Sequence, residues 1–109
     1  MPKTDRLQGT LSLLILRALK SRGPLHGYGI TLLIESIAGA PLKIEEGSLY
    51  PALHRMEQDG FIHAEWGTSE NNRRARYYSI TASGRKQLEV EQQRWAELSE
   101  AVSRVLRFA

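Results

Sequence analysis

The chain contains no cysteine among its 109 residues, which excludes disulfides, thiolate metal sites and a cysteine nucleophile. It also lacks an apolar run approaching the roughly 20 residues that a membrane-spanning helix needs. The apolar stretch from Leu11 to Leu19 is interrupted by Ser12 and Arg17 and is not followed by a cleavage signature, so it is unlike a signal peptide. These absences predict a cytoplasmic protein that neither crosses nor anchors in a membrane.

The residue patterns of common catalytic and metal sites are missing as well. The histidines His26, His54 and His63 lie far apart in the sequence, and no carboxylate accompanies them at metal-ligand spacing. Gly27 and Gly29 lack the preceding strand and the third glycine of a dinucleotide-binding fingerprint. We therefore expect no enzyme activity, no cofactor and no metal.

Charge is unevenly distributed along the chain, although the net charge is only +3. The segment 61–86 carries five basic residues against two acidic ones, whereas the segment 41–60 carries two basic residues against four acidic ones. A local concentration of arginine and lysine is typical of a surface that binds an anionic partner. The length of the chain allows only one domain core, so any such surface belongs to that domain.

The first predicted helix, within 7–20, is apolar on two sides. Leu11, Leu14, Ile15, Ala18 and Leu19 follow the spacing of one core-facing stripe. At about 100° per residue, two further leucines fall on the opposite side of the helix. We expect a partner chain to cover this second side, which consists of Leu13 and Leu16.

Two more helices are predicted before residue 61. One opens at Gly27-Tyr28-Gly29 and stops at 38–41, and a few extended residues, 42–45, follow it. The next begins with Ser48 as its N-cap, has Pro51 in its first turn and ends near Gly60. Its predicted buried side consists of Leu49, Ala52, Leu53 and Met56. The outer face then presents Pro51, His54, Arg55 and Gln58, with Tyr50 at its edge.

Two alternating segments and a long helix complete the chain. Ile62, Ala64 and Trp66 share one side of a predicted strand, and Arg76, Tyr78 and Ile80 share one side of the next. The polar turn between them, 67–75, is too long for a tight hairpin and predicts a projecting wing. Thr81 is the expected N-cap of a helix that reaches Arg107. Its residues at three- and four-residue spacing are typical of a coiled-coil seam: Leu88, Glu91, Trp95, Leu98, Val102 and Val105.

This order of elements predicts a mostly α fold with a small β-hairpin, of the α+β class. It favours a winged helix-turn-helix domain over 1–81, followed by a C-terminal dimerisation helix over 82–109. The predicted dimerisation residues are the two leucines of the first helix and the apolar residues of the last: Leu13, Leu16, Leu88, Trp95, Leu98, Val102 and Val105.

Three segments resemble the PadR-like family of bacterial transcriptional regulators. They are Gly-Pro-Leu-His-Gly-Tyr-Gly-Ile at 23–30, Glu-Gly-Ser-Leu-Tyr-Pro-Ala-Leu-His-Arg-Met at 46–56, and Arg-Arg-Ala-Arg-Tyr-Tyr-Ser-Ile-Thr at 73–81. The similarity covers most of the chain, from Leu11 to Leu88, and is greatest to the smaller members with one C-terminal helix. The resemblance implies a homodimer that represses transcription at a near-palindromic operator.

A winged helix of this kind binds DNA with its third helix in the major groove, while the wing and the second helix hold the backbone. The candidate DNA-binding residues are Tyr28, Ser48, Tyr50, His54, Arg55, Arg73 and Arg74. Arg76 ranks below the other wing arginines because it shares a strand face with Tyr78. Simpler roles remain open: a solvated loop for the arginines, a helix cap for Ser48, packing under the wing for Tyr50 and core packing for Tyr28.

Two further hypotheses concern partners other than DNA. Trp95, on the predicted dimerisation seam, packs in a core or lines a site for a small planar aromatic effector that releases the regulator from DNA. The alternative function is a winged-helix protein-interaction module without DNA binding, and the excess of acidic residues around the third helix favours it.

Overall fold

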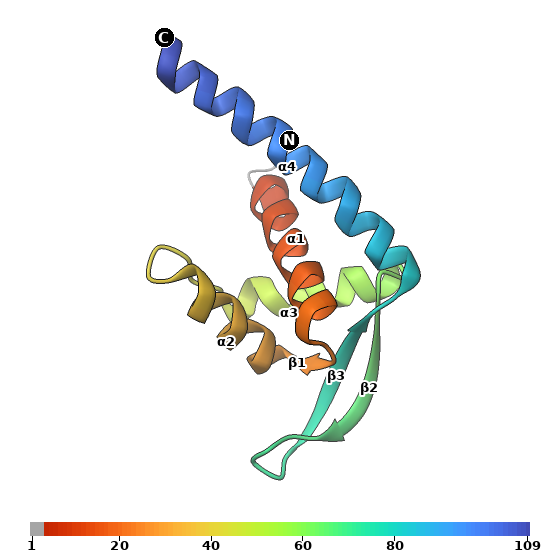
Figure 1. Cartoon of the computed structure of the whole chain (residues 1–109). Helices are drawn as coiled ribbons and strands as arrows, with labels where there is room; N and C mark the ends of the chain where they lie inside the picture. Colours follow the sequence, from red (N-terminus) through yellow and green to blue (C-terminus); the bar gives the residue numbers. More distant parts are fainter. Residues whose placement is uncertain (1–3) are drawn as a thin grey trace.

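A computed structural model of the chain describes residues 4–109 (Figure 1). Four helices and three short strands make up the fold, so the predicted class is confirmed. In chain order they are α1 (Thr4–Arg22), β1 (Leu25–His26), α2 (Gly27–Ala38), α3 (Glu46–Gln58), β2 (Ile62–Thr68), β3 (Arg74–Ile80) and α4 (Ala82–Phe108).

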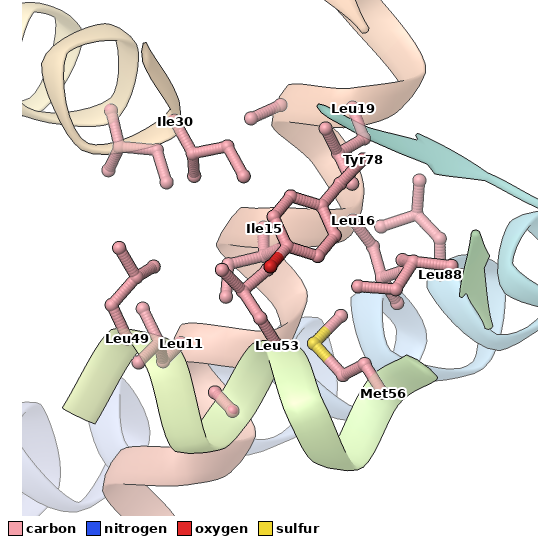
Figure 2. Packing of buried hydrophobic residues seen from close by; sticks show 14 residues of the cluster. Leu11, Ile15, Leu16, Leu19, Ile30, Leu49, Leu53, Met56, Tyr78 and Leu88 are labelled. Atoms are coloured by element: carbon pink, nitrogen blue, oxygen red, sulfur yellow. The ribbon is translucent and has the colours of Figure 1, made fainter. Parts of the chain in front are cut away.

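The core forms around α1, which packs against the other three helices and the sheet. Ile15 and Leu16 are fully buried although they lie on different sides of α1. Figure 2 shows Leu88 of α4 in the same cluster as Leu16, and Tyr78 of the sheet reaching toward Ile15. The prediction that a partner covers Leu16 is therefore wrong, because α4 of the same chain folds back over that side.

The sheet has three antiparallel strands in the order β1-β3-β2. The β2–β3 register pairs Ile62 with Ile80, Ala64 with Tyr78 and Trp66 with Arg76, as alternation predicts. Both strands run further than expected, so that the turn of the wing is confined to 69–73. The short strand lies at Leu25–His26, whereas the extended segment predicted at 42–45 pairs with no strand.

Helix α3 has the predicted buried side, made of Leu49, Ala52, Leu53 and Met56. Its start differs from the prediction. The N-cap is Glu45, whose carbonyl oxygen accepts a hydrogen bond from the Ser48 N–H at 3.0 Å. Ser48 therefore lies inside the first turn rather than capping it, and Pro51 falls one turn later than expected. The helix ends at Gln58 with Asp59 as its C-cap, and Gly60 follows with a φ of 79°.

Helix α4 is anchored to the core at its start, whereas apolar side chains further along the helix are exposed. The Thr81 hydroxyl accepts a hydrogen bond from the Gly84 N–H at 3.0 Å, which confirms the predicted N-cap. The same hydroxyl donates to the Gly60 carbonyl oxygen at 2.7 Å. A Cβ atom on Gly84 would collide with the Phe61 carbonyl oxygen, so only glycine allows this close approach. In Figure 1 the C-terminal half of α4 and the β2–β3 hairpin project from the body in different directions.

Candidate nucleic-acid interface

A hollow of about 860 Å³ separates the wing from the two helices of the helix-turn-helix. Its lining comes from the N-cap and first turns of α2, the outer face of α3, and the β2–β3 hairpin with its turn. All seven residues predicted to bind DNA lie on α2, α3 or the hairpin, and five of them line the hollow itself: Tyr28, Tyr50, His54, Arg73 and Arg74. The structure thus brings together residues that are up to 46 positions apart in the sequence, from Tyr28 to Arg74.

The turn of the wing is closed by backbone hydrogen bonds. The Ser69 N–H donates to the Arg73 carbonyl oxygen at 2.8 Å, and the Asn72 N–H donates to the Ser69 carbonyl oxygen at 2.9 Å. Asn72 adopts a φ of 58°, a left-handed conformation that asparagine tolerates better than most residues. Arg73, the last residue of this turn, and Arg74, the first residue of β3, have exposed side chains. Neither pairs with a carboxylate among the side chains that the structure describes.

Arg76 differs from the two wing arginines because its charge is neutralised within the chain. Its Nη2 donates to Glu57 Oε2 on α3 at 2.8 Å, and both side chains are partly buried. This ion pair connects the inner face of the hairpin to the C-terminal half of α3. It also gives a partner to Glu57, which is one of the acidic residues that are in excess around α3 in the sequence.

The outer face of α3 exposes His54 to the hollow, while Arg55 is half-buried. Tyr50 is half-exposed and its ring lies against the first residue of α2. A Cβ atom on Gly27 would come within 2.6 Å of the Tyr50 hydroxyl oxygen. Glycine at this position therefore lets the tyrosine bridge α2 and α3 at the edge of the hollow.

The start of α2 depends on a residue that the sequence did not single out. His26 is the N-cap, and its Nδ1 accepts a hydrogen bond from the Gly29 N–H at 2.9 Å. The neutral ring then carries its proton on Nε2, which lies 3.1 Å from Glu70 Oε1 in the wing. A backbone hydrogen bond and this contact with His26 lower the pKa of Glu70 below its usual value. The predicted helix start at Gly27 was the one sequence signal that pointed to this cap.

Tyr28, next to this cap, is 65% exposed. Core packing is therefore the wrong interpretation of this tyrosine, because a core side chain is removed from solvent. Its ring stacks near that of His26, with centroids 6.4 Å apart. Tyr28 thus presents its ring to the solvent at one wall of the hollow.

A second surface lies on α4, away from the hollow. Four residues of the predicted seam are exposed there, and they are Trp95, Leu98, Val102 and Val105. Leu88 does not belong to this surface, since it is fully buried against α1 in the same chain. Leu13 is half-buried beside the core. These exposed side chains make the distal part of α4 an apolar surface that a partner could cover.

Two observations bear on other kinds of site. Within the described residues, no three histidine, aspartate or glutamate side chains gather closely enough to hold a metal ion. No helix in the same part of the chain is long and apolar enough to cross a membrane.

Comparison with known proteins agrees with this geometry. The model of the transcriptional regulator PadR-like family matches residues 15–90. A transcriptional regulator of Mycobacterium tuberculosis is 31% identical over 77 residues, which cover 71% of this chain and 68% of that protein. Among solved structures, a PadR-like regulator from Bacillus cereus has a TM-score of 0.78 at 28% identity, covering 96% of this chain and 99% of the other. A transcriptional regulator from Clostridium thermocellum has a TM-score of 0.81 at 29% identity, covering 92% and 96% of the two chains.

Proposed function

Because the chain belongs to the PadR-like family of transcriptional regulators, we propose that it is a sequence-specific repressor that binds duplex DNA as a homodimer. The observation that carries the proposal is the pair of exposed arginines, Arg73 and Arg74, without carboxylate partners among the described residues. They lie at the mouth of a hollow whose other wall is α3. When α3 lies in the major groove of a duplex, the phosphates of that duplex come close to these arginines.

The roles of the residues follow from their places on α2, α3 and the wing. Arg73 and Arg74 contact phosphates, because a guanidinium donates two parallel hydrogen bonds to an anion. Ser48 and Tyr50, near the start of α3, also contact the backbone, as does Tyr28 on α2. His54 and Arg55 lie further along the outer face of α3 and contact base edges in the major groove.

Homodimer formation is proposed for the distal part of α4. Its exposed apolar residues recur at three- and four-residue spacing, which is the pattern by which two helices pack. A twofold dimer presents two copies of α3 to the DNA and matches a near-palindromic operator. The seam that we propose consists of Trp95, Leu98, Val102 and Val105, with Leu13 at its edge.

A small planar aromatic effector is a further part of the proposal, at Trp95. The indole is 50% exposed on the proposed seam, so two copies would face each other across a dimer. Flat aromatic compounds stack on such rings. Titration of a Trp66→Phe variant with a panel of planar aromatic compounds tests this, because Trp95 is then its one tryptophan. An unchanged fluorescence spectrum with every compound would count against the effector site.

The test of DNA binding is fluorescence anisotropy of the pure protein on labelled duplex from its own upstream region and on scrambled duplex, across a salt series. We expect tighter binding to the upstream duplex and a steep loss of affinity with salt. Absence of binding to both duplexes at low salt would instead favour the protein-interaction module. The ion pair between Glu57 and Arg76 weakens that alternative, since it neutralises acidic charge beside α3.

A further inference from the structure

Trp66 is a large aromatic side chain on the wing that the hydrophobic core does not use. It lies on β2, its side chain is 59% exposed, and it lines the hollow rather than the buried cluster. The residues at 62 and 64 on the same face of β2 pack on the core. Trp66 is the next residue on this face of β2, and it lies beyond the part of the strand that packs on the core.

Two arginines of the neighbouring strand surround this indole. The register pairs Trp66 directly with Arg76, and it pairs Thr68 with Arg74, so both arginines share the tryptophan's face of the hairpin. The guanidinium carbon of Arg74 lies over the indole at 4.5 Å from the ring centroid, and that of Arg76 lies at 5.8 Å. Both distances are within the range of cation–π attraction.

The two arginines differ in whether their positive charge is still available to a ligand. Arg76 is bound to Glu57 at 2.8 Å, so α3 already compensates its charge. Arg74 has no carboxylate partner among the described side chains, and the indole is the group that orders its guanidinium. A continuous row of contacts therefore runs from Glu57 on α3 through Arg76 and Trp66 to Arg74 in the wing.

We propose that Trp66 is a positioning residue for DNA binding, which holds the guanidinium of Arg74 toward a phosphate of the bound duplex. The inference rests on the proposed function. A guanidinium that stacks on an aromatic ring uses its face, so the N–H groups at its edge stay free to donate to phosphate. Arg73 is one residue away but has no ring contact among the described residues, and it serves as the internal comparison.

The experiment is a double-mutant cycle on DNA binding, measured by anisotropy with labelled duplex from the protein's own upstream region. Trp66→Ala should weaken binding about two- to fivefold per wing, the range of an exposed cation–π contact. It should have little further effect in the Arg74→Ala background, whereas its effect should multiply with that of Arg73→Ala. Trp66→Phe keeps an aromatic face and should recover part of the loss.

The salt dependence shows whether Arg74 still contacts phosphate when Trp66 is removed. Trp66→Ala leaves the arginine in place, so the slope of log affinity against log salt should stay as in the wild type. Arg74→Ala should reduce that slope by about 0.9 per wing. Equal effects of Trp66→Ala with and without Arg74 would overturn the positioning role. Wild-type protein that binds no duplex would refute the DNA-binding function itself, and so is a distinguishable failure.

Discussion

Removing both wing arginines should change the salt dependence of DNA binding by a predictable amount. In the variant Arg73→Ala/Arg74→Ala, each wing loses two guanidinium groups that have no carboxylate partner among the described residues. A homodimer loses four in total. Each phosphate contact contributes about 0.9 to the slope of log affinity against log salt, so the slope should fall by about 3.6. Between 50 and 200 mM salt, the wild type should lose about 150-fold more affinity than the variant.

The matched control removes the same charge elsewhere. Arg85 and Lys86 are exposed in the first turns of α4 and do not line the hollow. The length of the hairpin, about 20 Å, separates them from the wing turn. The variant Arg85→Ala/Lys86→Ala should therefore keep the wild-type slope.

Anisotropy with upstream and scrambled duplexes measures both slopes. The wing variant should lose affinity for the two duplexes to a similar extent, because phosphate contacts carry no sequence information. Equal slopes for the wing variant and the control variant would mean that only net charge matters. A loss of sequence preference with an unchanged slope would place the arginines at base edges instead.

Three further substitutions test the core, the sheet and the proposed dimer surface. Leu16→Ala removes a fully buried side chain and should lower the free energy of unfolding by about 2–5 kcal/mol in urea denaturation, more than Leu13→Ala does. Burial raises the pKa of Tyr78, so the unfolded state releases this proton first as pH rises. The contribution of Tyr78 to stability should therefore be constant well below pH 10 and fall above it, and Tyr78→Phe should reduce that fall in urea denaturation. Leu98→Glu adds a charge to the exposed face of α4 and should convert dimer to monomer in sedimentation, with the helical content of the fold retained.

Local periodicity predicted the elements that have enough residues to show it. The buried face of α3 and the paired faces of β2 and β3 were predicted correctly, because core side chains recur every three or four residues in a helix and every two in a strand. Strand β1 has only two residues, which is too short for alternation, and its partner β3 lies some 50 residues further on. Its pairing is a tertiary contact that no local pattern encodes.

The error at Leu16 and the cap at His26 that went unpredicted have a similar origin. An apolar second side on α1 correctly indicated that something covers it, but periodicity does not say whether the cover belongs to the same chain. Here the start of α4 supplies it through Leu88. His26 as an N-cap is uncommon, and its second bond, to Glu70, depends on how the wing folds over α2. Several residues around the hollow could thus be predicted from the sequence, whereas the contacts that bring them together could not.

The anchoring of α4 connects the two proposed surfaces. Thr81 binds both Gly60 and Gly84, and Leu88 is packed in the core beside Leu16, so the first turns of α4 move with α3 and the wing. Most of the exposed apolar side chains of α4 lie in its distal part, from Trp95 onward, where we propose that a second copy packs. In the proposed homodimer, the angle at which two such helices cross would therefore fix the separation of the two α3 helices, which has to match one helical turn of DNA, about 34–36 Å. An effector that wedges between the Trp95 rings would alter this separation without touching the DNA-binding residues.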